Sequence, residues 1–156
     1  MALLAIALGS NLGNRSDFLC RALAALEEEV GALGAISPFV ESEAEGFESE
    51  HTFLNAAALI QTTHSPEELL ERTQRIEQRL GRTKKSTPST GYSDRTIDID
   101  LLLLEDCIMH TDRLTLPHPL MHLRSFVLAP LCCIAPTMEH PILKKSIQVL
   151  LENERH

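Results

Sequence analysis

The chain has 156 residues, of which 44% are hydrophobic and 23% charged. This length is enough to bury a core, and the composition is that of a globular protein, so we expect one globular domain over residues 1–156. A net charge of −8 argues against a broad basic surface for nucleic acid, although a few local cations would suffice for a nucleotide. Four cysteines without a C-x-x-C pair indicate free thiols in a reducing compartment. The apolar N-terminus lacks a basic region and is too short to span a bilayer, so we expect a cytoplasmic protein without a membrane partner.

The first third of the chain predicts strands and one helix. Residues 2–8 are continuously apolar, which is typical of a central strand covered on both faces. Apolar residues then recur at helical spacing from about residue 16 to 30, and Gly31 ends that helix. Further strands are expected over residues 36–43 and 53–62.

The next helix has clear start and stop signals. Ser65 is the expected N-cap, Pro66 occupies the first helical position and Glu68 completes a capping box. Gly81 ends the helix. Residues 82–95 then show no hydrophobic period and are rich in Lys, Arg, Ser and Thr. Because a loop of this length is uncommon in a compact domain and is often functional, we predict a mobile lid over phosphates.

Three polar side chains in these elements have both a structural and a functional interpretation. Asn55 lies inside an apolar strand, where its amide needs either backbone partners or a ligand with a matching amide-like edge. Gln74 and Glu77 are three residues apart on the predicted helix, so they can reach one site together. Solvation is the plainer explanation for that pair.

A strand that carries two aspartates follows the predicted lid. Side chains two residues apart share a face of a strand, so Asp98 and Asp100 point the same way. The other face is expected to carry the apolar residues Ile97, Ile99, Leu101 and Leu103. Two strand residues span roughly 6.6 Å, which suits carboxylates that hold one Mg²⁺ or bridge two ions roughly 3.5–4 Å apart. An ordinary strand with an acidic, solvent-facing edge is the alternative.

The order strand, helix, strand, strand, helix, strand predicts an α+β fold. It is the ferredoxin-like βαββαβ arrangement, an antiparallel sheet covered by helices with right-handed crossovers. A C-terminal β/α extension is expected to add a short strand near residues 107–109, an extended segment over 113–118 and two helices. The first of these helices would cover residues 126–133 with Ser125 as its cap, and the second residues 146–151.

The tail contains a second group of candidate functional residues: Arg113, His118, His122, Arg124 and Phe126. Each alone has an ordinary surface or structural explanation. Together with Arg82, Lys84, Lys85 and Arg95 they would supply the cationic groups that a polyphosphate needs. Metal-holding carboxylates, cationic groups and a lid are the recurring parts of phosphoryl transfer. The P-loop and protein-kinase motifs are absent, which excludes those two classes.

An ordered set of motifs over nearly the whole chain resembles the 6-hydroxymethyl-7,8-dihydropterin pyrophosphokinase family. The motifs that carry the resemblance are A-L-G-S-N-L-G-N-R, F-L-N-A-A, P-E-E-L-L-E-R-T-Q-R-I-E-Q-R-L-G-R, R-T-I-D-I-D-L-L-L and R-L-T-L-P-H-P-L-M-H-L-R-S-F-V-L-A-P-L. The resemblance implies transfer of pyrophosphate from ATP to the pterin hydroxymethyl group in folate biosynthesis, with release of AMP. It also implies small-molecule partners alone, and we expect a monomer.

The same resemblance implies roles for individual residues. Asp98 and Asp100 would hold two Mg²⁺ ions, and Arg82 and Arg95 would complete the catalytic group after lid closure. The pterin would lie between the rings of Phe53 and Phe126 and would bond to Asn55, which can donate and accept together. ATP would be bound by Gln74, Glu77, Lys84, Tyr92, Arg113, His118 and Arg124.

The chain departs from the family pattern at a few positions. It has no Trp, and Tyr92 stands near the end of the lid, where the family often has Trp. Pro119 follows His118 at an often aromatic position, and Phe53 replaces a frequent Tyr. These departures concern affinity and lid behaviour. Two alternatives remain: a ferredoxin-like binding or regulatory module, and a Mg²⁺-dependent phosphohydrolase that uses the same aspartates.

Overall fold

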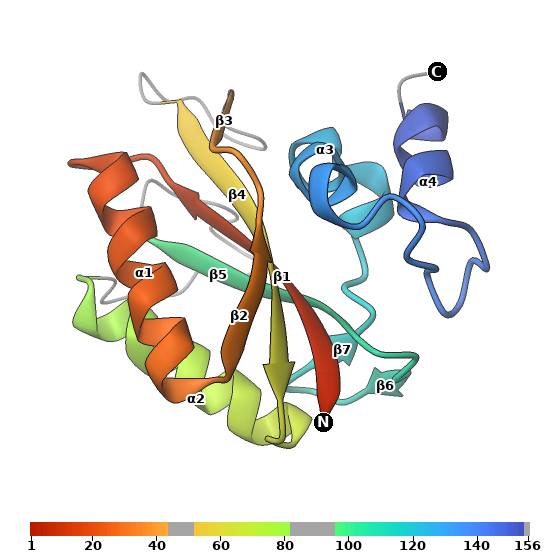
Figure 1. Ribbon diagram of the computed structural model, residues 1–156, viewed down its shortest axis with the longest axis horizontal. Helices are drawn as coiled ribbons and strands as arrows, with labels where there is room; N and C mark the ends of the chain where they lie inside the picture. Colours follow the sequence, from red (N-terminus) through yellow and green to blue (C-terminus); the bar gives the residue numbers. More distant parts are fainter. Residues whose placement is uncertain (44–51, 82–95, 155–156) are drawn as a thin grey trace.

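A computed structural model describes residues 1–43, 52–81 and 96–154 of the chain, and an antiparallel sheet forms its centre (Figure 1). The sheet order is β2 (Ala32–Ile36), β4 (Phe53–Thr62), β1 (Ala2–Ser10) and β5 (Asp98–Leu104), and β3 (Val40–Ser42) also pairs with β4. All of these pairings are antiparallel. The order and direction are those of the split βαβ fold, so the predicted ferredoxin-like architecture is confirmed.

Helices cover both faces of the sheet. On one face lie α1 (Arg15–Glu29) and α2 (Pro66–Arg79). On the other face lie α3 (Ser125–Ile134) and α4 (Ile147–Glu154), which are reached through the small hairpin of β6 (Met109–His110) and β7 (Thr115–Leu116) and the short helix η1 (Met121–Leu123) (Figure 1). In the described ranges no helix is long and apolar enough to cross a membrane.

The two hydrophobic cores follow from alternation along the strands. In β1, Leu4, Ile6 and Leu8 pack toward α1 and α2, whereas Ala5 and Ala7 pack toward α3 and α4. This is the period of two that a strand imposes on its side chains. The small alanine side chains let the C-terminal helices approach the sheet closely. The prediction of a central strand covered on both faces is therefore confirmed.

A β-bulge in β5 makes one part of the predicted strand pattern wrong. Ala5 pairs with Leu103 and Ile6 pairs with Leu101, so Leu102 is an extra residue in β5. Because one inserted residue reverses the faces beyond it, Leu103 packs with the α3–α4 core instead of sharing a face with Ile99. Before the bulge the pattern holds, and the two aspartates share a face as predicted.

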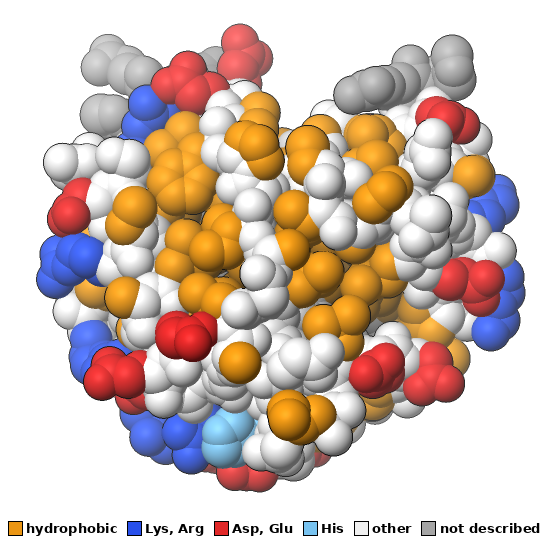
Figure 2. Space-filling model, in the orientation of Figure 1, with side chains coloured by type: hydrophobic (Ala, Val, Ile, Leu, Met, Phe, Trp, Pro, Cys, Tyr) orange, Lys and Arg blue, Asp and Glu red, His pale blue; other side chains and the backbone are white. Residues whose placement is uncertain are grey.

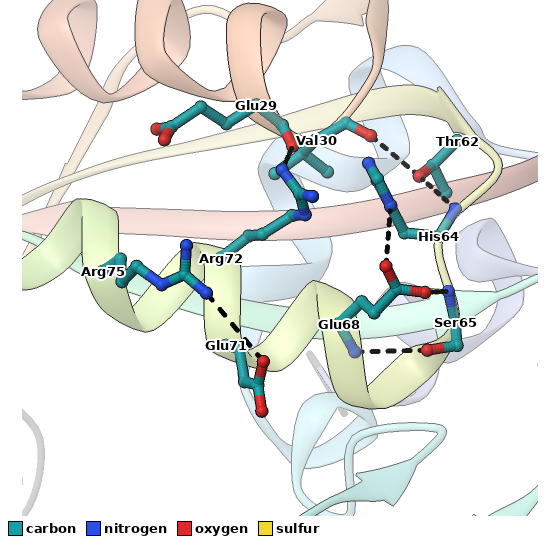
Figure 3. A network of polar contacts seen from close by, with 9 residues as sticks. All are labelled: Glu29, Val30, Thr62, His64, Ser65, Glu68, Glu71, Arg72 and Arg75. Atoms are coloured by element: carbon teal, nitrogen blue, oxygen red, sulfur yellow. Dashed lines mark hydrogen bonds and ion pairs between the residues drawn. The ribbon is translucent and has the colours of Figure 1, made fainter.

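The start of α2 confirms the predicted capping box. Ser65 Oγ accepts a hydrogen bond from the Glu68 N–H at 3.3 Å, and Glu68 Oε1 accepts one from the Ser65 N–H at 3.1 Å (Figure 3). These bonds, together with one to His64, lower the pKa of Glu68. On the same helix Arg72 donates to the Glu29 carbonyl at 2.9 Å, which ties α2 to the end of α1.

Other predicted boundaries shift by a few residues. The expected strand over 36–43 is two strands, because Ser37 turns its hydroxyl to accept from the Ala57 N–H at 2.8 Å and interrupts the ladder. In α3, Ser125 is the first helical residue and Arg124 occupies the N-cap position without a side-chain capping bond, so the predicted Ser125 cap is wrong. Helix α1 ends at Glu29 with Val30 as its C-cap, and the predicted stop residue Gly31 follows directly. A Cβ at Gly31 would lie 2.0 Å from the Gln61 carbonyl oxygen, so the close approach to β4 requires glycine.

Candidate active site

A pocket of about 520 Å³ opens between the end of β1, β3, β4 and β5 on one side and the start of α3 on the other. Hydrophobic side chains gather in the indentation between the β3–β4 flank and α3 (Figure 2). The residues predicted to bind the pterin and the metal, Phe53, Asn55, Phe126, Asp98 and Asp100, all line this pocket. Arg124, which was predicted to bind ATP, lines it as well. Segments that are distant in the sequence therefore meet at one site.

The aromatic part of the pocket is built from β4 and α3. Phe53 lies beside Gly9 of β1, where a Cβ would come within 3.4 Å of the Phe53 Cδ1 atom. The missing side chain thus leaves room for the ring against the strand. Phe126 lines the opposite, helical side, and the Arg124 guanidinium lies 5.6 Å from its ring centre. Two phenyl rings that line one pocket are suited to a flat, conjugated ligand.

Asn55 is buried and its amide group is held by β3. Its Nδ2 donates to the Val40 carbonyl at 3.1 Å and to Ser42 Oγ at 2.7 Å. Both amide hydrogens are therefore used, and the Val40 carbonyl fixes which end of the amide is nitrogen because it can only accept. The expectation that Asn55 both donates and accepts toward a ligand is wrong for this geometry, which leaves Oδ1 as the acceptor. Ser42 itself was missed, because a serine in a short strand carries no sequence signal.

The two aspartates both line this pocket. Burial, the charge of Asp98, a hydrogen bond with it and the charge of Glu77 raise the pKa of Asp100 well above its usual value, although Arg124 opposes this shift. The repulsion between these carboxylates would be offset by a divalent cation bound beside them. Carboxylate oxygens suit Mg²⁺, which keeps several waters or substrate oxygens as its other ligands. Residues 1–43, 52–81 and 96–154 contain no cluster of three or more His, Cys, Asp or Glu side chains that could hold a metal ion.

A second pocket, of about 610 Å³, lies on the other side of β5. Asp100 lines both pockets, and the second pocket also contains Leu70, Arg113 and His118. The structure therefore places two of the predicted nucleotide-binding residues next to the carboxylate pair. The arrangement offers an aromatic pocket and a more polar pocket that meet at one carboxylate.

His118 is a neutral hydrogen-bonding group and not a cation. Its Nδ1 accepts from the Leu120 N–H at 3.1 Å. Burial and the positive charge of Arg124 lower the pKa of His118 to about 4, although Asp98 partly opposes them. The proton of the neutral ring therefore lies on Nε2, which can donate to a phosphate oxygen. The expectation that His118 adds positive charge is wrong because the ring is buried beside an arginine.

Two predicted nucleotide-binding residues do not line either of these pockets. Gln74 is half-buried on α2. Glu77 is buried and its Oε2 accepts from the Ile99 N–H at 2.8 Å. His122 also lies elsewhere, with its ring centre 6.2 Å from that of His140 in the C-terminal segment and the two rings in an edge-on arrangement. Arg82, Lys84, Lys85, Tyr92 and Arg95 lie outside the described residues.

Comparison with known proteins identifies the family. The model of the 7,8-dihydro-6-hydroxymethylpterin-pyrophosphokinase (HPPK) family matches residues 5–136. A relative from Porphyromonas gingivalis, named 2-amino-4-hydroxy-6-hydroxymethyldihydropteridine pyrophosphokinase, is 46% identical over 142 residues, which are 90% of this chain and 95% of the relative. A protein of the same name from Bacillus subtilis is 42% identical over 135 residues, or 86% of this chain and 78% of its own length.

Solved structures agree in fold. Plasmodium falciparum HPPK-DHPS with pteroate superposes with a TM-score of 0.77 at 14% identity and covers 97% of this chain. The wild-type HPPK-DHPS structure gives a TM-score of 0.75 at 14% identity over the same share. This chain spans 44% of the length of those proteins, so they support the fold alone. With the family model and the curated relatives, the chain belongs to the 7,8-dihydro-6-hydroxymethylpterin-pyrophosphokinase family.

Proposed function

We propose that this protein transfers the pyrophosphoryl group of ATP to the hydroxymethyl group of 6-hydroxymethyl-7,8-dihydropterin, which yields the pterin diphosphate and AMP in folate biosynthesis. The observation that carries this proposal is the position of Asp100, which lines an aromatic pocket and a polar pocket at once. A pterin in the first pocket and a nucleotide in the second would meet at the carboxylates. Holding two substrates in this way makes the reaction effectively unimolecular.

The aromatic pocket has the groups that a pterin needs. The rings of Phe53 and Phe126 would stack on its two faces, and each such contact is worth roughly 0.5–1.5 kcal/mol beyond the area buried. The Asn55 Oδ1 atom would accept from a ligand N–H, since the Asn55 amide hydrogens are bound to β3. Asn55 would therefore recognise the pterin by accepting a hydrogen bond from an N–H group on the edge of its ring.

The phosphates would lie between the pockets. Asp98 and Asp100 would hold two Mg²⁺ ions, which supply charge compensation and orientation for the polyphosphate when bound. Arg124 is buried beside the aspartates and would contribute positive charge on the pocket side. Arg113 and the His118 Nε2–H would bind phosphate oxygens from the second pocket. None of these roles requires a general base, because positioning and electrostatics supply most of the acceleration in phosphoryl transfer.

Residues outside the described ranges are assigned through the family motifs. Arg82 and Arg95 would bind the transferred group, and Lys84 and Tyr92 would contribute to nucleotide binding. We propose in addition a single-domain, monomeric and cytoplasmic protein. Support for one domain comes from the single sheet that strands of residues 2–10 and 98–104 share.

A product assay tests the function. The protein is incubated with Mg²⁺, ATP and 6-hydroxymethyl-7,8-dihydropterin, and nucleotides and pterins are separated by chromatography. AMP that forms only with the pterin, in equal amount to the pterin diphosphate, is the expected result. AMP or ADP without the pterin would instead identify a phosphohydrolase. Pterin binding without any product would identify a binding module.

A further inference from the structure

Glu77 is the most deeply buried acidic residue of the described chain, with 4% of its surface exposed, whereas Asp98 and Asp100 are only partly buried where they line the pocket. Its neighbours Arg75, Gln78 and Arg79 on α2 are exposed. Burial of a carboxylate costs several kcal/mol unless strong hydrogen bonds compensate for the lost water. A buried position on an otherwise polar stretch of helix therefore points to a specific partner.

That partner is the backbone of β5. Glu77 Oε2 accepts from the Ile99 N–H at 2.8 Å. Ile99 is paired with Leu8 of β1 on one side, and β5 is the last strand of the described sheet on the other. An N–H on the outer edge of such a strand finds no neighbouring strand to accept it. The carboxylate occupies the place of the missing strand and, because it is charged, makes a stronger bond than a carbonyl would.

The position of this bond relates it to the candidate metal ligands. Ile99 stands between Asp98 and Asp100, and its N–H belongs to the peptide unit that joins Asp98 to Ile99. The orientation of that peptide plane contributes to the directions in which the Asp98 and Asp100 side chains point. Further along the same edge, the His118 N–H donates to the Leu102 carbonyl at 2.8 Å. The edge of β5 is therefore held at both ends of the segment that carries the carboxylates.

We infer that Glu77 is a positioning residue, whose carboxylate holds the Ile99 amide so that Asp98 and Asp100 present their oxygens together to the cations and phosphates. The inference rests on the proposed function, because it takes the aspartates as metal ligands. Direct nucleotide binding fits Glu77 less well: it lines neither pocket that contains Asp100, and its negative charge would repel a polyphosphate.

The test compares Glu77→Gln and Glu77→Leu in the full chain. Gln keeps an oxygen acceptor within reach of Ile99, whereas Leu keeps a similar volume without any acceptor. Glu71 is a matched control, since it is an exposed carboxylate on the same helix; Glu71→Leu should leave every measurement unchanged. Displacement of a reacting group by about 1 Å can lower the rate by about 100-fold. Substitution of a residue that orients a metal ligand lowers metal affinity by about 10- to 100-fold.

Expected results separate positioning from binding. Glu77→Leu should lower kcat by about 10- to 100-fold, weaken the apparent affinity for Mn²⁺ and speed hydrogen exchange of the Ile99 amide, with the pterin KM unchanged. Glu77→Gln should restore most of kcat and of the Ile99 protection. Pterin affinity without nucleotide, measured by calorimetry, should be the same in all variants. The Gln variant decides the question if the Leu variant fails to fold.

Several outcomes would overturn the inference. One is wild-type kcat, Mn²⁺ affinity and Ile99 exchange in Glu77→Leu. Another is a Gln variant as impaired as the Leu variant despite a protected Ile99 amide, because the charge and not the position would then matter. A third is weaker binding of metal-free ATP at unchanged kcat, which would identify a nucleotide ligand. If the wild-type protein formed no pterin diphosphate, the proposed function would fail, whereas Mn²⁺ affinity and amide exchange would still decide the role of Glu77.

Discussion

Removal of the Asn55 acceptor tests how the aromatic pocket recognises its ligand. Both hydrogens of the Asn55 amide are donated to acceptors of β3. The Oδ1 atom is therefore the polar atom of this side chain that can bond to a ligand in the pocket. Asn55→Leu removes that acceptor at similar volume and leaves one ligand N–H buried without a partner. Such a group costs about 1–3 kcal/mol, which corresponds to a roughly 5- to 150-fold weaker Kd for the pterin.

The assay is calorimetric titration of 6-hydroxymethyl-7,8-dihydropterin without nucleotide. Ser42→Ala serves as a graded control, because it removes one of the two acceptors that orient the Asn55 amide and leaves the Val40 carbonyl. Its expected cost is smaller, about 0.5–1.5 kcal/mol. Thermal unfolding of each variant establishes that the sheet is intact. Pterin binding within twofold of wild type in a folded Asn55→Leu protein would refute the proposed hydrogen bond.

Three further predictions concern the metal site, the fold and pH. Asp98→Ala should abolish product formation while pterin binding and the fold persist; undiminished turnover would contradict the metal assignment. Ser65→Ala removes one capping bond of α2 and should lower the free energy of unfolding by about 1 kcal/mol in chemical denaturation, so an unchanged midpoint would count against the cap. Burial and the nearby His122 lower the pKa of His140. As pH falls, His140 therefore binds a proton in the unfolded chain before it does so in the folded protein. Stability should therefore be complete above about pH 6.5 and decrease as pH falls through the lowered pKa, with a weaker decrease in His140→Gln.

Features that depend on neighbouring residues could be predicted from the sequence. The capping box at Ser65 and Glu68 is a contact within one helical turn, and its residues are sufficient to specify it. The shared face of Asp98 and Asp100 follows from the strand period alone. The order of strands and helices was enough to predict the ferredoxin-like fold, because few topologies satisfy the right-handed crossover rule.

Family resemblance extended the prediction across the chain. Phe53, Asn55 and Phe126 were assigned to one substrate site from motifs, and the structure places all three in one pocket. No local pattern relates a residue of β4 to one of α3. The family motifs carried this information, because they mark residues that meet in the folded proteins of the family although the motifs do not describe that fold.

Tertiary structure alone decided which partner each polar group has. The Asn55 amide hydrogens are used up only because β3 pairs beside β4, and Glu77 meets Ile99 only because α2 packs along the edge of β5. The bulge at Leu102 depends on the register with β1, and the neutral state of His118 depends on burial near Arg124. Sequence spacing determines which face of its own element a side chain occupies. Burial, charge state and hydrogen-bond partners depend on segments that are distant in the chain, and these come into contact only when the sheet and its helices have packed.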